Sequence, residues 1–356
     1  MARITNFRDQ FRKQLSERVD LSQVKQLLEA AESGRWDVFP RDVYNAFYCC
    51  IASSRHAYRW ATIPVVSAAQ LEKTVTIPAE LEEPWGFLQR HFGCPSDSGN
   101  NMSNLVLNFD SEVGGEQIFK INTGMPVSIT SSEEHFARVF FDIERLALPI
   151  YHDVVQAIIA FARDDKASCA RRMANISAQL RPALNSYYDR VHDKTIPLSI
   201  WLSRVQGFFA WGAGRIDDTT GQWEWYDGLS GNQILLFQVL DAFLGMEQYL
   251  SARDQERNVP LRQRAFCKAV EKYSFRGKLS SPNDENEMKI LREFDEIIKK
   301  LRVFRSAHRT RAKNYLSQPA PERLPMTAGK SLLKADMGQS LDSLDQFMIR
   351  RFEQTV

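Results

Sequence analysis

The sequence is poor in cysteine and has almost no excess of charge of either sign. Five cysteines occur in 356 residues, and two of them are adjacent at Cys49 and Cys50. An odd number argues against a disulfide framework and favours a reducing compartment, so we expect a cytoplasmic protein. Lys plus Arg number 46 and Asp plus Glu number 44, for a net charge of +2. A nucleic-acid-binding module usually carries a strong basic excess, so we expect no nucleic-acid partner.

Long apolar runs are also missing. Charged residues break every apolar stretch before about 18 residues, which is the length needed to cross a membrane. The opening MARITNFRDQFRKQ has no apolar core of the kind a signal peptide needs. We therefore expect no membrane partner. The near-zero net charge is compatible with a homodimer but does not demand one.

Several motifs with diagnostic local spacing do not occur. The sequence has no G-x-G-x-x-G, H-E-x-x-H or C-x-x-C. Residues 329–331 (GKS) match only the tail of a Walker A loop, because Leu324 stands where its first glycine should be. Residues 228–231 (GLSG) are one residue short of a hydrolase nucleophile elbow. These absences argue against a P-loop nucleotidase, a locally encoded zinc site and a serine hydrolase.

What the sequence does contain is apolar periodicity of about 3.6 residues, which predicts an all-α fold. A smaller N-terminal mixed or helical domain is expected over 1–128, and a larger helical domain over 129–356. Prolines break up residues 61–130, where we expect loops with short helices and a strand pair near 104–110 and 117–121. Residues 212–232 should form a long loop. Helices are expected over 5–32, 41–60, 133–163, 166–191, 195–211, 233–250, 260–273, from Ser281 to about 316, and over 341–352.

One predicted helix carries a histidine on its apolar face. Its stripe continues by four residues to His308, and consists of Leu291, Phe294, Ile298, Leu301 and Phe304. A buried imidazole needs partners for its ring nitrogens, so His308 is either a hydrogen-bonded core residue or a metal ligand. Arg305 lies on the neighbouring edge of the stripe. Its guanidinium could pair with a buried acid or with the carboxylate of a bound group.

A second predicted helix, over 233–250, carries Asp241 among apolar residues. A lone buried carboxylate costs several kcal/mol unless it is paired, so we expect a cation beside it, and Arg305 is a candidate. The result would be either a plain buried ion pair or one that supports a ligand site. The preceding loop, YDGLSGNQ at 226–233, leads into a helix start that could bind an anion or could be a simple capped turn.

These two regions resemble the indoleamine 2,3-dioxygenase family. The loop at 226–233, followed by FQVLDAFLG at 237–245, resembles the family's glycine-rich loop and its F-Q-x-x-D-x-x-L-G helix. RSAH at 305–308, with Tyr315 seven residues on, resembles the family's haem-ligand helix. Shorter matches, such as AYRW at 57–60 and WG at 211–212, keep the same order along the chain. The resemblance extends from about residue 40 to about 330.

The resemblance implies a haem b cofactor. His308 would be the ligand of the haem iron and therefore the metal-binding residue. Arg305 would contact a haem propionate and pair with Asp241. Tyr226 and Gly228 would complete the cofactor site.

It also implies a distal side, where an indole and O2 meet. The residues expected to take part in catalysis there are Ser230, His135 and Arg138. The residues expected to contact the substrate are Arg204, Gly231, Phe87, Thr327 and Gly329. Thr327 and Gly329 belong to the loop 326–331, which takes the place of the family's mobile loop over the substrate.

The implied reaction is insertion of O2 across C2–C3 of the indole ring of tryptophan or a derivative. Two departures from the family pattern stand out: Val205 falls where the family has an arginine, with Arg204 one residue earlier, and Leu229 replaces a glycine. An alternative is therefore a haem enzyme of secondary metabolism with the same fold, which monooxygenates or rearranges a modified tryptophan, as in the pyrrolnitrin pathway. A non-catalytic helical binding protein is a third alternative.

Overall fold

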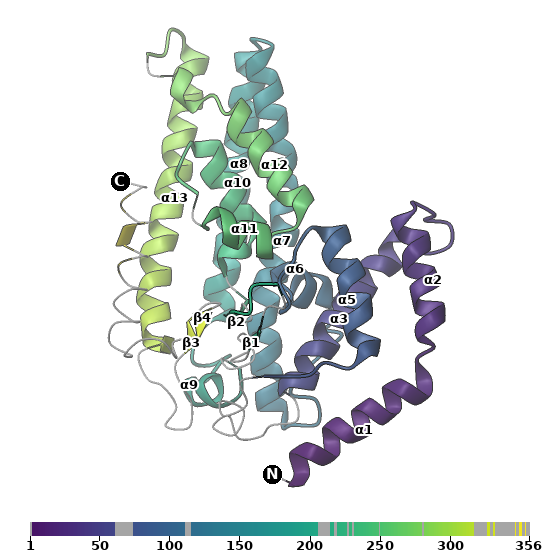
Figure 1. Ribbon diagram of the computed structural model, residues 1–356. Helices are drawn as coiled ribbons and strands as arrows, with labels where there is room; N and C mark the ends of the chain where they lie inside the picture. The colour runs from purple at the N-terminus through teal and green to yellow at the C-terminus, as the bar shows by residue number, and fades with distance from the viewer. Residues whose placement is uncertain are drawn as a thin grey trace.

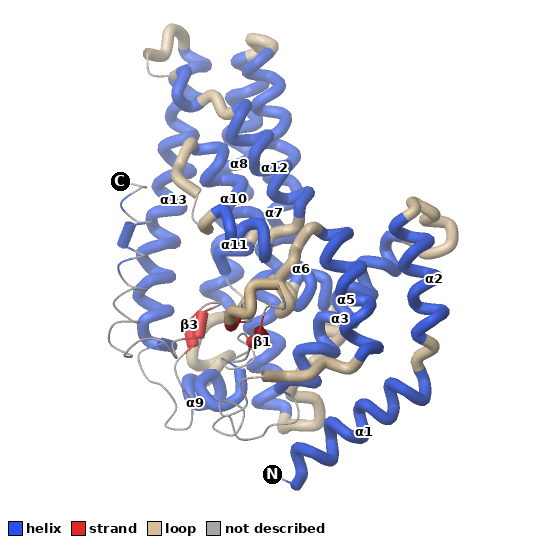
Figure 2. The backbone as a smooth tube through the Cα atoms, in the orientation of Figure 1, coloured by secondary structure: helices blue, strands red, loops and turns tan. Residues whose placement is uncertain are grey.

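The computed structural model describes residues 2–60, 74–110, 115–205, 214–216, 219–225, 228–229, 231–248, 250–279, 281–316, 326–327, 330–331, 346, 349–350 and 353. Over these residues the protein is mainly helical (Figure 2), which confirms the predicted all-α class. The strands described are short. β1 (Gly214–Ile216) pairs with β2 (Trp223–Trp225), and β3 (Met326–Thr327) pairs with β4 (Lys330–Ser331), both antiparallel.

The N-terminal helices pack around their own hydrophobic cluster. They are α1 (Ala2–Arg18), α2 (Leu21–Glu32), α3 (Arg41–Trp60), α5 (Ala79–Phe92), α6 (Asn101–Asn104) and the 3₁₀ turn η1 (Val106–Asn108). Tyr48 of α3 and Trp85 of α5 are fully buried in this cluster, with ring centroids 5.5 Å apart. Asp20 starts α2 by accepting hydrogen bonds from the first free backbone N–H groups.

Three long helices form the frame of the remaining chain (Figure 1). α7 (Val127–Ala162) packs along α8 (Lys166–Arg190), and α8 packs along α13 (Glu285–Leu316). α10 (Leu235–Leu244), α11 (Ala252–Asn258) and α12 (Leu261–Tyr273) lie beside them. The second hydrophobic cluster fills the space between these helices. The boundary expected at residue 128 stays a prediction.

We expected no stretch long and apolar enough to cross a membrane, and α7 is an exception. Its length and composition would suffice. In the structure it packs against α8, α10 and α12 instead. Three carboxylates on α7, those of Asp142, Glu144 and Asp153, are buried and hydrogen-bonded to protein groups. A helix that buries paired carboxylates against its neighbours behaves as a core helix of this fold.

Other expectations need correction at the level of local structure. The helix expected over 195–211 is a single turn, α9 (Leu198–Ile200), followed by a π-helical turn at Trp201–Val205; residues 206–213 lie outside the described part. The loop expected over 212–232 contains the β1–β2 hairpin. The predicted strand pair near 104–121 is reduced to one bridge between Phe109 and Gln117. The helix expected over 341–352 falls largely outside the described residues.

Candidate functional site

His308 lies deep in the protein on α13, on the stripe that its spacing predicts. Its ring is 5.1 Å from that of Tyr187 and 5.8 Å from that of Phe304, centroid to centroid. Part of the side chain is nevertheless accessible to solvent. Burial lowers the pKa of His308 to about 4, so the imidazole is neutral at physiological pH. Neither ring nitrogen is hydrogen-bonded to any described group.

A neutral imidazole with an accessible edge in aromatic surroundings suits coordination of a haem iron. Within the described part of the chain, no three His, Cys, Asp or Glu side chains converge as they would on a bare metal ion. A group bound through His308 would therefore bring the iron's other ligands itself, as a porphyrin does. The residues present fit haem on this ground.

Arg305 and Asp241 form the ion pair that the sequence predicts. Arg305 Nη2 donates to Asp241 Oδ1 at 2.7 Å, and both side chains are largely buried. Burial lowers the pKa of Arg305 to about 10, which leaves it protonated at neutral pH. The guanidinium lies one turn before His308, close enough to serve a carboxylate of a group bound there.

The helix that carries Asp241 is held at both ends. At its start, the Leu235 N–H donates to Oε1 of Glu144 on α7 at 2.6 Å. At its end, Ser274 and Arg276 donate to the carbonyl oxygens of Phe243 and Leu244. The anion expected at this helix start is thus one of the chain's own carboxylates. Glu144 was not among the residues predicted from the sequence. It nevertheless has the feature that singled out Asp241, because it is an acid within an apolar helix.

The glycine-rich loop before α10 is tied to α6. Gln233 Oε1 accepts from the Asn101 N–H at 2.9 Å, and Gln233 Nε2 donates to the carbonyl of Gly228 at 3.2 Å. Gly228 and Leu229 are buried, whereas Gly231 lies in a 3₁₀ turn with open space where a Cβ would stand. This tie links the N-terminal helices to the start of α10.

A small cavity of about 30 Å³ lies between the N-terminal helices, α7 and the glycine-rich loop. This volume is about that of one water molecule in the liquid. Val205, Leu229 and Ala137 are among the apolar residues that line it. The polar side chains around it are those of Ser53, His56, Asn104, Asn108, Gln117 and Glu133. No Lys or Arg is among the described residues that line it.

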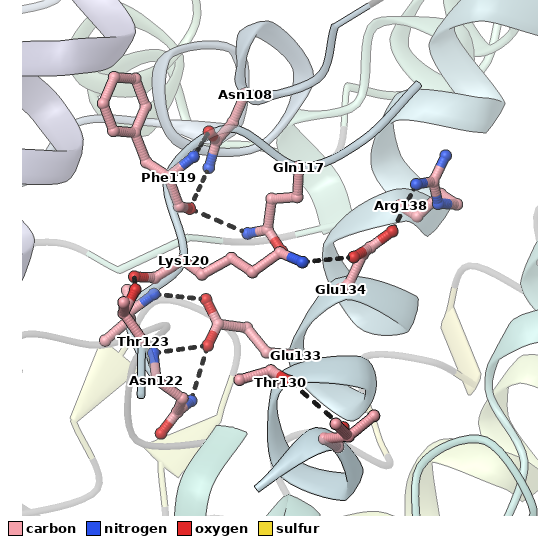
Figure 3. A network of polar contacts seen from close by, with 12 residues as sticks. Asn108, Gln117, Phe119, Lys120, Asn122, Thr123, Thr130, Glu133, Glu134 and Arg138 are labelled. Atoms are coloured by element: carbon pink, nitrogen blue, oxygen red, sulfur yellow. Dashed lines mark hydrogen bonds and ion pairs between the residues drawn. The ribbon is translucent and has the colours of Figure 1, made fainter. Parts of the chain in front are cut away.

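Glu133, which lines this cavity, holds the chain segment before α7 in place (Figure 3). Its carboxylate accepts from the backbone N–H groups of Ile121 and Asn122 at 2.7 and 2.8 Å, and from Asn122 Nδ2 at 2.7 Å. Burial raises the pKa of Glu133 despite these bonds. Asn122 Nδ2 also donates to the carbonyl of Arg204 at 3.2 Å, so Glu133 reaches the π-helical turn through one residue.

Three of the predicted site residues point elsewhere. Arg138 is paired with Glu134 (Figure 3). Its guanidinium also lies over the ring of Phe109. His135 is on α7 between the residues that face the cavity, and its Nδ1 is buried without a partner. Glu133 and Ala137 are one turn apart on the face of α7 that lines the cavity, and residues 135 and 138 are turned away from that face. The roles expected for His135 and Arg138 in catalysis stay predictions.

Phe87 is the third. It packs in the N-terminal cluster with the guanidinium of Arg90 4.5 Å from its ring centroid. Tyr226, Ser230 and Gly329 lie outside the described residues, and of Thr327 only the backbone, in β3, is described. Arg204 lies in the π-helical turn beside Val205, and it is Val205 that lines the cavity.

The sequence was also compared with known proteins. The sequence pattern of the family described as "Indoleamine 2,3-dioxygenase" matches residues 42–346. A curated relative, indoleamine 2,3-dioxygenase nanC of Aspergillus nanangensis, is 25% identical over 190 residues. That alignment covers 47% of this chain and 46% of the relative, so the chain matches less than half of the relative's length.

Proposed function

Because the chain belongs to the indoleamine 2,3-dioxygenase family, we propose that it is a haem-dependent oxygenase acting on the indole ring of tryptophan or a related indole. The observation that carries this proposal is His308, a neutral, half-buried residue packed against aromatic rings, one turn after the paired Arg305. The relative's name, indoleamine 2,3-dioxygenase, favours O2 insertion across C2–C3 as the reaction.

The chain's own residues have distinct parts in this scheme. His308 would hold the iron, and its low pKa keeps a lone pair available for coordination down to acidic pH. Arg305, fixed by Asp241, would bind a propionate. Phe304 and Tyr187 pack around the imidazole and exclude water from that side. When bound, haem b supplies the oxygen chemistry, while the protein supplies binding, orientation and a dry pocket.

A second candidate is a haem enzyme with the same fold and a different outcome on a modified indole. The observation that favours it is Val205, which is fully buried and lines the cavity beside Leu229. Neither side chain can neutralise a substrate carboxylate. This candidate predicts haem binding without N-formylkynurenine from tryptophan.

We also propose a cytoplasmic location. All five cysteines are described, and each is a free thiol. Unpaired buried cysteines suit a reducing compartment.

The deciding experiment is an absorption spectrum of protein produced with a haem precursor. We expect a Soret band in the wild type that is lost or shifted in His308→Ala. The matched control is His152→Ala on α7, whose side chain is 61% exposed, and it should keep the wild-type spectrum. Incubation with tryptophan, a reductant and O2 then separates the two candidates by whether N-formylkynurenine is formed. Absence of a Soret band, even after haem is added, would overturn both.

A further inference from the structure

Glu144 is a buried carboxylate that the proposed function does not use. Its side chain lies in the middle of α7 and the residue is 8% exposed. One carboxylate oxygen accepts from the Leu235 N–H and the other from the Tyr151 hydroxyl, both at 2.6 Å. Leu235 is the first residue of α10, so the carboxylate stands at the positive end of that helix, where an anion is stabilised.

The charges at the two ends of α10 match its dipole. Glu144 stands at the start, and the cationic Arg276 donates to the Leu244 carbonyl at the end at 3.1 Å. Asp241 lies six residues into the helix and meets Arg305 of α13. Displacement of α10 along its axis would therefore move the carboxylate that fixes Arg305, one turn before His308.

We propose that Glu144 is a positioning residue for the His308 site, which it serves by holding α10 so that Asp241 keeps Arg305 in place. This inference rests on the proposed function, since it gives Glu144 a part in retaining haem. A positioning role differs from an ordinary buried polar contact in the path of its effect. The loss of the Glu144 charge must be felt through α10 and then in α13. A contact that only stabilises the fold would act on its neighbours without that preference.

The chain offers a matched control on the same helix. Asp153 of α7 is also buried, and it accepts from Arg172 at 2.8 Å and Gln179 at 2.9 Å, both on α8. None of its contacts with described residues involves α10. Asp153→Asn and Glu144→Gln thus neutralise one buried carboxylate each on α7, and only Glu144→Gln disturbs the start of α10.

The first measurement is hydrogen exchange by mass spectrometry on the purified full chain. Glu144→Gln should speed exchange in α10 and in the Arg305–His308 turn, whereas Asp153→Asn should act on α8 and leave that turn unchanged. Tyr151→Phe removes one partner of Glu144 but leaves its bond to Leu235, so its effect should be smaller. Equal effects of Glu144→Gln and Asp153→Asn on the Arg305–His308 turn, or no effect of Glu144→Gln there, would overturn the proposal.

The second measurement is transfer of haem from the loaded protein to excess apomyoglobin. Glu144→Gln should release haem about tenfold faster than the wild type, the lower end of what outer-shell changes cost. Asp153→Asn should release it at the wild-type rate. Unchanged release from Glu144→Gln, with faster release from Asp241→Asn, contradicts the proposal. A wild type that binds no haem would refute the proposed function, and hydrogen exchange would still decide the role of Glu144.

Discussion

Asp241 and Arg305, 64 residues apart in the sequence, meet in a buried ion pair with 2.7 Å between Oδ1 and Nη2. Each charge makes burial of the other tolerable, because neither could leave water alone without losing several kcal/mol of solvation. The pair joins α10 to α13 at the turn that leads to His308. Its integrity is therefore linked both to the stability of the fold and to the geometry of the candidate haem site.

Breaking this pair should be costly. Asp241→Asn leaves a buried guanidinium without its counter-charge, and we expect a loss of about 3 kcal/mol in the free energy of unfolding. Urea unfolding followed by circular dichroism measures it. The exposed pair of Glu285 and Lys289, at 2.9 Å, provides the comparison, and Glu285→Gln should leave the midpoint unchanged. A similar midpoint for both variants would contradict the assignment of the Asp241 pair as buried and essential.

His308 should make the haem-free protein sensitive to mild acid. Burial lowers its pKa from 6.5 to about 4, so below pH 6.5 the unfolded chain takes up a proton that the folded chain refuses. Stability falls as the pH drops through this window and levels off near pH 4, by at most about 3 kcal/mol. His308→Phe removes this loss. Unfolding measured at pH 7 and pH 4.5 should show a smaller pH effect in the variant, and equal pH effects would refute a buried neutral imidazole.

Asn122 should tolerate a carboxylate poorly and in a pH-dependent way. Asn122→Asp places a second carboxylate where Nδ2 now lies 2.7 Å from Glu133 Oε2, and it removes a hydrogen bond. We expect a loss of about 2 kcal/mol at neutral pH. The loss should shrink toward pH 4.5, because burial already raises the pKa of Glu133 and a shared proton relieves the repulsion. Asn122→Ser, which adds no charge, should show a smaller difference in stability loss between the two pH values than Asn122→Asp.

Leu229 tests whether the small cavity belongs to the substrate side. Leu229→Ala removes a buried side chain that lines it and should destabilise the protein by about 3 kcal/mol. If the cavity adjoins the indole, ring-substituted tryptophans should gain in kcat/KM relative to tryptophan. Leu240→Ala, at a fully buried position of α10 that does not line the cavity, should cost stability without changing this preference. If both variants show the same kcat/KM of ring-substituted tryptophans relative to tryptophan, the cavity does not adjoin the substrate.

Local periodicity predicted the helices and the identity of the central pair. The helix expected over 41–60 is α3. Of the apolar stripe that leads to His308 on α13, Phe294, Leu301 and Phe304 are buried, whereas Leu291 and Ile298 are partly buried. Asp241 and Arg305 each stand among apolar residues of a predicted helix. Their pairing could be predicted because an unpaired buried charge is too costly.

Contacts between distant segments could not be predicted in this way. Glu144 meets α10 across 91 residues, and periodicity says which face of a helix is buried but not which segment covers it. The π-helical turn at Trp201–Val205 departs from α-helical geometry, and an apolar period of about 3.6 residues does not predict such a turn. The roles expected for His135 and Arg138 on the substrate side stay predictions, because the position of a residue on a helix face does not say which group that face meets.

The rotation of α7 has a further consequence. Glu133, at the cavity, and Glu144, at the start of α10, are separated by eleven residues of one continuous helix. Eleven residues make almost three whole turns and about 16 Å, so the two carboxylates leave the helix in nearly the same direction. A single residue inserted between them would rotate one carboxylate by about 100° and leave the two about 120° apart around the helix. This stretch of α7 can therefore accept substitutions but not a small insertion or deletion. A small change in length would turn Glu133 and Glu144 toward different sides of the helix.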